Sequence, residues 1–207
     1  VYTDDGLTGV GEASGWPRVV QTAIQDLTPL LIGEDPQHIE RLWQKMMCSM
    51  MGHGMTGIVG AGAMTGIEMA LWDIMGQACG EPVHRLLGGR LHDRSSCFAF
   101  LQGNSPDKLA EDARCWLAQG FDVFYVKVGL GRERDLGCVA AVREAIGAGP
   151  KLRIDANQAW QVGEAVSMLQ ALAEFDIDFA EQPVHWTDLD GMARLRQSVP
   201  MPIAIDQ

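Results

Sequence analysis

Lys151-Leu-Arg-Ile-Asp-Ala-Asn157 contains a short apolar run that closes on an acidic residue, Asp155. The same pattern returns in Asp178-Phe-Ala-Glu-Gln-Pro183, which carries Glu181, and in Pro202-Ile-Ala-Ile-Asp206. The acids are 181 − 155 = 26 and 206 − 181 = 25 residues apart, an interval that fits one strand, one helix and two short loops. We therefore expect three carboxylates at the C-terminal ends of three successive parallel strands.

Carboxylate oxygens that converge at one edge of a sheet suit a hard divalent cation such as Mg²⁺. Acids also follow strands as N-caps of the next helix, and a single aspartate would be read in that way. The regular spacing of Asp155, Glu181 and Asp206 favours a metal site over three separate caps.

Strands alternate with helical patterns throughout the second half of the chain. The strand-like runs are Ser96–Leu101, Val123–Val128, Leu152–Asp155, Phe179–Glu181 and Ile203–Asp206. This alternation predicts an α/β fold with a parallel sheet and right-handed crossovers. A (β/α) barrel of the TIM type would place the acids at its active-site edge, but a complete barrel needs about 250 residues. Five strands in about 110 residues predict an incomplete barrel, and we expect this chain to be a portion of a longer protein.

A doubly wound nucleotide-binding sheet is the alternative architecture. Gly129-Leu-Gly131 follows one predicted strand and precedes a helix, as a dinucleotide loop would. The third glycine of that motif is absent, because Arg134 stands at its position. The alternative also leaves the three spaced carboxylates unexplained.

The first half of the chain has a different pattern. A hairpin is expected over residues 1–14, turning at Asp4-Asp5-Gly6, followed by helices near residues 19–31 and 36–50. The stretch from Met51 to Gly62 carries five glycines and predicts a mobile loop. An amphipathic helix follows and should end at Gly80. The predicted boundary lies near Gly88-Gly89-Arg90, which gives domains of residues 1–90 and 91–207.

Composition narrows the choice of partner and compartment. The net charge of −11 argues against nucleic acid or an anionic membrane surface as partner. The five cysteines are scattered without a CxxC pair, which predicts free thiols in a reducing, cytoplasmic compartment. We find no secretory signal and no apolar run that could span a bilayer, so no membrane partner is expected.

Tyr125 and Lys127 lie two apart on one predicted strand and so share a face. If that face points into the barrel, Lys127 lies near the metal, where a dication and burial would disfavour its charged form. Lys127 could then act as a general base. The alternative is a lysine that extends from a strand end into solvent.

These motifs, taken in order, resemble the enolase superfamily, in the mandelate racemase/muconate lactonizing enzyme group. The resemblance covers nearly the whole chain. The matching segments are Asp4-Asp5-Gly6-Leu7-Thr8-Gly9-Val10-Gly11-Glu12-Ala13, Ala70-Leu71-Trp72-Asp73-Ile74, Leu86-Leu87-Gly88-Gly89, Val126-Lys127-Val128-Gly129, Asp155-Ala156-Asn157-Gln158-Ala159-Trp160, Glu181-Gln182-Pro183 and Ile203-Ala204-Ile205-Asp206.

The resemblance implies part of an α+β capping domain before the first strands of a (β/α)₇β barrel. It implies Mg²⁺ held by Asp155, Glu181 and Asp206, with an aspartate as third ligand as in the muconate lactonizing branch. The shared reaction step is abstraction of a proton α to a substrate carboxylate. Lys127 matches the second lysine of a Lys-x-Lys pair, while Tyr125 replaces the first. That tyrosine can still donate a hydrogen bond to a substrate oxygen.

Four further residues are candidate substrate contacts. Asn157 and Gln182 would contact the substrate carboxylate or orient the ligands, and His185 follows a strand end near the site. His53 lies in the glycine-rich stretch that corresponds to the lid of the family, although an exposed loop histidine is an equally good interpretation. The acid or base on the opposite face of the substrate would lie beyond Gln207.

Three functions stay open at this point. The first is an Mg²⁺-dependent enzyme acting on a small-molecule carboxylate, as an acid-sugar dehydratase, a racemase or epimerase, or a cycloisomerase, in a homo-oligomer. The second is a non-catalytic or truncated metal-binding relative. The third is a nucleotide-dependent oxidoreductase.

Overall fold

The computed structural model describes residues 1–51, 57–103 and 105–206. The chain divides into two compact units, Val1–Asp93 and Arg94–Gln207. In the described part of the chain, no helix has both the length and the apolar character needed to cross a membrane.

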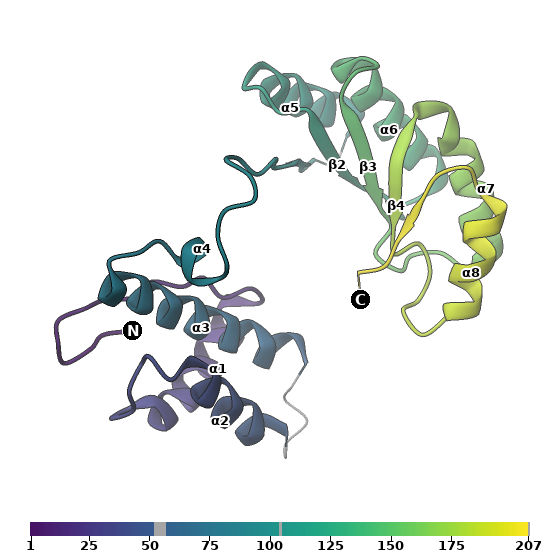
Figure 1. Cartoon of the computed structure of the whole chain (residues 1–207). Helices are drawn as coiled ribbons and strands as arrows, with labels where there is room; N and C mark the ends of the chain where they lie inside the picture. Colours follow the sequence, from purple (N-terminus) through teal and green to yellow (C-terminus); the bar gives the residue numbers. More distant parts are fainter. Residues whose placement is uncertain (52–56, 104, 207) are drawn as a thin grey trace. The chain divides into compact units, whose positions relative to one another are not determined.

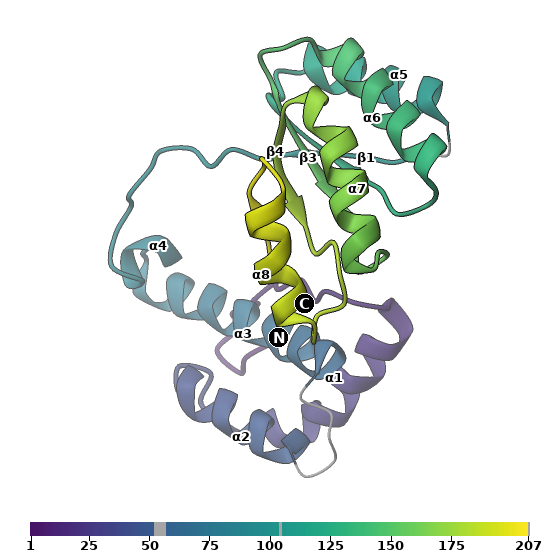
Figure 2. The same cartoon turned by 90° about the vertical axis from the view of Figure 1, so that its right-hand side faces the viewer.

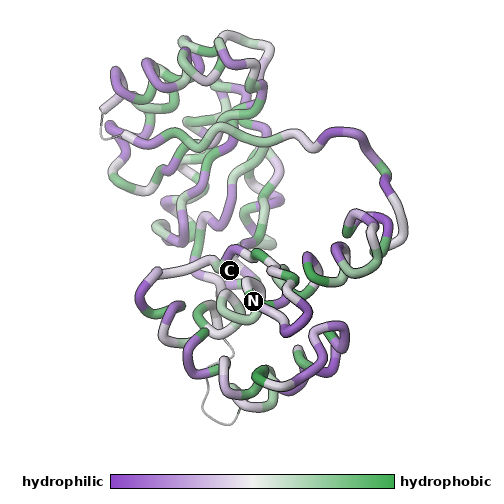
Figure 3. Tube along the Cα trace, turned by 90° about the vertical axis from the view of Figure 1, so that its left-hand side faces the viewer, coloured by the Kyte–Doolittle hydropathy of each residue, from purple (hydrophilic) through white to green (hydrophobic). Residues whose placement is uncertain are grey.

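The first unit is mainly helical (Figure 1). The predicted hairpin is reduced to a single antiparallel bridge between Tyr2 and Thr8. The helices pack their apolar faces around one core that includes Leu27, Leu42 and Met46, and Figure 3 shows green and purple alternating along their turns. These helices are α1 (Pro17–Leu31), α2 (Ile39–Met51) and α3 (Ile58–Cys79), and the short α4 (Val83–Leu86) follows without a buried residue.

The glycines of this unit allow the N-terminal segment to lie directly on the backbone of α3. A Cβ atom at Gly9 would collide with the carbonyl oxygen of Ala70, and one at Gly62 would collide with that of Ser14. The prediction of a loop over residues 51–62 is therefore wrong from Ile58 onward, where the helix already runs. Residues 52–56, which include His53, lie outside the described residues. The predicted stop at Gly80 is confirmed by its left-handed φ of 66°.

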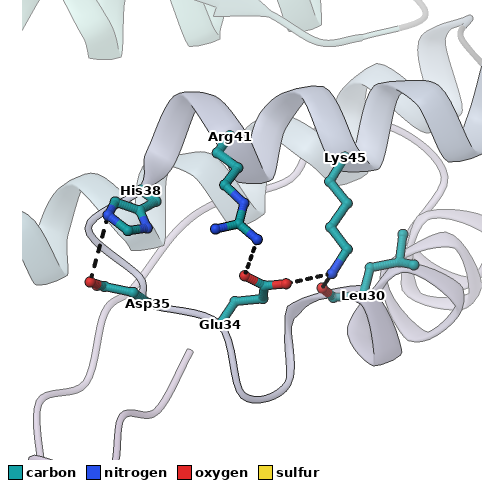
Figure 4. Close-up of polar contacts among 6 residues, drawn as sticks. All are labelled: Leu30, Glu34, Asp35, His38, Arg41 and Lys45. Carbon is teal, nitrogen blue, oxygen red and sulfur yellow. Dashed lines mark hydrogen bonds and ion pairs between the residues drawn. The ribbon is translucent and has the colours of Figure 1, made fainter.

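A charged side-chain cluster fastens the turn between α1 and α2 (Figure 4). The amine of Lys45 donates to the carboxylate of Glu34 and to the carbonyl of Leu30, each at 2.7 Å. The guanidinium of Arg41 lies 3.4 Å from the same carboxylate. Because Leu30 belongs to α1 and both cations belong to α2, the cluster ties the two helices together.

The second unit contains a five-stranded, wholly parallel sheet in the order β1-β2-β3-β4-β5. This confirms the predicted α/β class. The strands are β1 (Ala99–Leu101), β2 (Val123–Lys127), β3 (Lys151–Asp155), β4 (Ile177–Glu181) and β5 (Ile203–Ala204). The helices between them are α5 (Pro106–Ala118), α6 (Arg132–Ile146), α7 (Val162–Leu172), followed by the 3₁₀ turn Ala173–Phe175, and α8 (Leu189–Ser198).

The helices of this unit cover one face of the sheet. Figure 1 and Figure 2 show α5 to α8 on one side of the strands. Val126 and Ile154, which are fully buried, belong to the core on that side. Sequential strand order with helices on one face is the wall of a (β/α) barrel, open here because five strands do not close it. The doubly wound alternative is wrong, since such a sheet reverses its strand order and carries helices on both faces.

Candidate active site at the strand ends

Three of the predicted site residues occupy one row across the sheet. Lys127, Asp155 and Glu181 end β2, β3 and β4 and are paired in register, and Ala204 of β5 continues the row. Residues in register on parallel strands point to the same face, so all three side chains lie on the face opposite the helices. The fold therefore brings together the proposed base and two of the proposed ligands.

Lys127 forms an ion pair with Asp155. The side chain of Asp155 is 2 % exposed, whereas that of Lys127 is 42 % exposed. We expected burial to help make Lys127 a base, and this expectation is not met within the described part of the chain. The amine instead lies 6.0 Å from the ring centres of Phe100 and Tyr125.

Asp155 is held by its own loop as well as by the lysine. The backbone N–H of Asn157 donates to a carboxylate oxygen of Asp155 at 2.6 Å, and Asn157 takes a left-handed φ of 46° to reach it. The alternative in which these acids cap helices is wrong for Asp155 and Glu181. The N-cap of α7 is Gln161, and the N-cap of α8 is Asp188, which accepts from the N–H of Gly191 at 2.8 Å.

Tyr125 lies between two aromatic rings and two carboxylates. Its ring centre is 5.0 Å from that of Phe98 and 5.6 Å from that of Phe100. Burial raises the pKa of the Tyr125 phenol, and its hydrogen bond to Glu181 and the nearby charge of Asp155 raise it further. The phenol is therefore a neutral hydrogen-bond donor that lies close to both carboxylates.

Asp206 lies two residues beyond Ala204, where the paired part of β5 ends, although the predicted strand reached Asp206 itself. Its backbone N–H donates to the side-chain oxygen of Gln182 at 2.9 Å. Across residues 1–51, 57–103 and 105–206, no group of three or more His, Cys, Asp or Glu side chains is placed to hold a metal ion. Of the three predicted ligands, the structure pairs two on neighbouring strands, Asp155 and Glu181.

The chemistry of these two residues fits a hard cation. Carboxylate oxygens are the donors that Mg²⁺ prefers. Asp155 and Glu181 present them on neighbouring strands, and the ammonium of Lys127 on Asp155 shows that the pair attracts positive charge.

The remaining predicted contacts lie in the loops after β3 and β4. Asn157 is exposed, and Gln182 is buried with its amide directed at backbone atoms. His185 is exposed, bonds to the hydroxyl of Thr187 at 2.8 Å and packs beside Trp186. The structure does not place His185 in the row of Lys127, Asp155 and Glu181.

Sequence reasoning missed Asp135, near the start of α6. This buried carboxylate accepts from the N–H groups of Gly129 at 2.8 Å and Leu130 at 3.2 Å. An internal anion therefore occupies the loop that resembled a phosphate cradle. An acid inside the first turn of a helix after a glycine loop is the signal that could have identified it.

Two family matches together cover 188 of 207 residues, as 88 plus 100. Residues 1–88 match the family described as mandelate racemase/muconate lactonizing enzyme, N-terminal domain, and residues 108–207 match the enolase C-terminal domain-like family. The chain belongs to the enolase superfamily. This superfamily chain spans about half the length of the curated relatives that it matches.

Its relatives carry several activities. D-galactarolactone cycloisomerase of Agrobacterium fabrum is 37% identical over 209 residues, which is 99% of this chain and 55% of the relative. N-succinyl-L-Arg/Lys racemase of Bacillus cereus is 34% identical over 99% of this chain and 56% of its own length. Arabinonate dehydratase of Saccharolobus solfataricus is 36% identical with the same coverage.

Solved structures of the superfamily share this fold. The 3,6-anhydro-D-galactonate cycloisomerase of Zobellia galactanivorans matches with a TM-score of 0.88 and 37% identity, over 99% of this chain and 57% of that one. The dipeptide epimerase of Enterococcus faecalis matches with a TM-score of 0.84 and 33% identity, over 99% and 59%.

Proposed function

We propose that the full-length protein is an Mg²⁺-dependent enzyme that abstracts a proton α to the carboxylate of a small-molecule substrate, through an enediolate. The single observation that carries this proposal is the row of Lys127, Asp155 and Glu181 on the face of a sequential parallel sheet that lies opposite its helices. Membership of the enolase superfamily supports the same chemistry. In this proposal residues 1–90 are part of the capping domain and residues 91–207 are the first part of the barrel.

Asp155, Glu181 and Asp206 would hold the cation. When bound there, Mg²⁺ neutralises the negative charge that builds on the substrate's carboxylate oxygens. Asp155 and Glu181 already lie on adjacent strand ends, and the backbone of Asp206 is tied to the residue that follows Glu181.

Lys127 is the proposed base. Its amine lies at the exposed end of β2, within reach of a substrate bound beside Asp155 and Glu181. The Tyr125 phenol would stay protonated and donate to a substrate oxygen. Asn157 and His185, in the loops after β3 and β4, are kept as proposed substrate contacts. His53, which lies outside the described residues, is kept as a proposed contact from the sequence alone.

The reaction class is proposed at the level that the relatives share. Asp206 as third ligand is the sole basis for the muconate lactonizing branch, and the relatives named above give that branch no support. We therefore propose dehydratase, racemase or epimerase, and cycloisomerase as the candidate classes. Cytoplasmic location and self-association stay predictions, which cell fractionation and sedimentation would check.

Exchange of the substrate α-proton in D₂O tests the function. Full-length protein is incubated with sugar acids, sugar lactones and N-acylated amino acids, with Mg²⁺ or with EDTA, and the α-proton signal is followed by NMR. We expect Mg²⁺-dependent exchange that is lost in Lys127→Met and kept in Lys108→Met, a surface variant on α5. Tight Mg²⁺ binding without exchange on any of these substrates would contradict the enzymatic proposal.

A further inference from the structure

We propose that Gln182 is a positioning residue that holds the candidate ligand Asp206 against the end of β4. This inference rests on the proposed function, since it concerns the third corner of the proposed cation site. It also changes the role expected for Gln182, from a substrate contact to a support for the ligand set.

Among the hydrogen bonds of Gln182, four join three strand ends. Its backbone N–H donates to the carbonyl of Ala204 at 3.0 Å, and its own carbonyl accepts from the N–H of Gln158 at 2.7 Å. Its side-chain amide donates to the carbonyl of Val184 at 3.0 Å and accepts from the N–H of Asp206 at 2.9 Å. One residue therefore connects the loop after β3, the end of β4 and the end of β5.

The backbone conformation of Gln182 costs free energy, and hydrogen bonds to neighbouring backbone groups hold it in place. Its φ is 36°, a left-handed value that residues other than glycine rarely adopt, and it is 1 % exposed. A buried amide is tolerated only when its donors and acceptors are paired, as they are here with backbone groups. Backbone strain fixed in this way is typical of residues that shape a functional site.

The side chain of Gln182 accepts a hydrogen bond from Asp206, just beyond the last strand pair. β4 and β5 pair over only two positions, Ala180 with Ile203 and Glu181 with Ala204. Gln182 then takes a left-handed φ, and within residues 105–206 the strand pairing of β4 with β5 ends at Glu181 and Ala204. The side-chain oxygen of Gln182 supplies the acceptor that a longer strand would have supplied and ties the backbone of Asp206 to the end of β4.

Removing this support should weaken cation binding without removing a ligand. Groups that orient metal ligands typically change metal affinity by about 10–100-fold when mutated. Gln182→Met keeps the length of the side chain but loses the oxygen and the nitrogen of its amide. We expect this variant to bind Mg²⁺ about 10–100-fold more weakly. The backbone N–H of Asp206 should also exchange faster with solvent in that variant, which a purely structural change elsewhere would not cause.

The experiment uses the full-length protein and two readouts, Mg²⁺ affinity by calorimetry and hydrogen exchange of the Asp206 amide by NMR. Gln182→Glu keeps the acceptor oxygen and should keep the Asp206 amide slow to exchange. Gln158→Met is the matched control, because Gln158 also has a left-handed φ, of 68°, but its side chain accepts from Trp186 and not from Asp206. That control should bind Mg²⁺ as the wild type does.

The outcomes separate this inference from the proposed function. If wild type binds Mg²⁺, Asp155→Asn does not, and Gln182→Met binds as wild type, the positioning role is wrong and the proposed function stands. If wild type does not bind Mg²⁺, both are wrong. If Gln182→Met fails to fold, a titration of the wild-type protein tests the positioning role instead. Mg²⁺ must then shift the NMR signals of the Asp206 amide and of the Gln182 side chain together. Absence of that joint shift overturns the inference.

Discussion

Tyr125 is the residue at which this chain departs most clearly from the pattern of its superfamily. A phenol stands where a second ammonium was expected beside Lys127, and it lies against Glu181 and Asp155. A neutral phenol can donate its one hydrogen to a carboxylate, whereas an ammonium would also have brought a positive charge. The phenol therefore leaves the negative charge of this edge to Lys127, and to the cation if one binds as proposed.

The raised pKa of Tyr125 predicts a phenol that resists ionisation in the folded protein. A free tyrosine ionises at about pH 10. Phenolate absorbance is measured against pH for folded wild type and folded Tyr125→Phe, and the second curve is subtracted from the first. The difference should show no ionisation step at about pH 10. The same difference measured in urea should show the step, because unfolding removes the burial and the neighbouring carboxylates. A native step at about pH 10 would contradict the placement of Tyr125.

At the scale of elements, Arg143 of α6 joins the helix to the two loops below the sheet. Its guanidinium donates to the carbonyls of Gly147, Pro150, Phe175 and Asp176, at 2.8 to 2.9 Å. Those carbonyls lie before β3 and before β4. We expect Arg143→Met to lower the free energy of unfolding by about 2–4 kcal/mol, because several charged hydrogen bonds are lost and carbonyls are left unpaired.

Urea denaturation followed by circular dichroism measures this effect. Arg114→Met, an exposed substitution on α5, is the matched control and should change the midpoint little. An Arg143→Met midpoint equal to that of Arg114→Met would show that the four contacts do not stabilise the unit.

The turn between α1 and α2 gives a prediction about pH. The hydrogen bond from Lys45 and the charges of Arg41 and Lys45 hold the pKa of Glu34 below its ordinary value of 4.5. A carboxylate whose pKa is lowered on folding stabilises the fold above its unfolded pKa, and the contribution is lost as the pH falls through the folded value. Glu34→Gln should therefore lower Tm at pH 7, and its difference from wild type should vanish in acid. A Tm difference between Glu34→Gln and wild type that does not change with pH would contradict a stabilising role for the ionised Glu34 carboxylate.

Sequence reasoning could predict the strand–helix order because the signals are local. The predicted strand ends at Asp155 and Glu181 lie where their patterns placed them. The prediction for the glycine-rich stretch was wrong from Ile58 because helix propensity disfavours glycine, whereas close packing against Ser14 requires it at Gly62. That requirement comes from a segment far away in the sequence.

The sequence could predict those residues of the candidate site that lie at strand ends. Lys127, Asp155 and Glu181 share a row because the strands are parallel and in register. The role of Gln182 could not be inferred, because it depends on backbone groups that only the folded loops bring near.

At the scale of the whole molecule, an exposed segment without regular structure joins the two compact units. Residues 87–98 are exposed throughout and contain Arg90 and Arg94. Limited digestion of this chain by trypsin should cut first at these two arginines, because exposed irregular backbone fits a protease more readily than helices do. Mass spectrometry of the first fragments checks this. First cuts within α1 to α3 or α5 to α8 would contradict the division into units.

On the face of the sheet opposite its helices, Asp155, Glu181 and Asp206 are proposed to share one cation beside Lys127. The most direct measurement is anomalous X-ray scattering from crystals of the full-length protein grown with Mn²⁺ in place of Mg²⁺. The account predicts one strong peak bounded by the carboxylates of Asp155, Glu181 and Asp206, absent in Asp155→Asn. A peak bounded by other side chains, or no peak at this edge of the sheet, would contradict it.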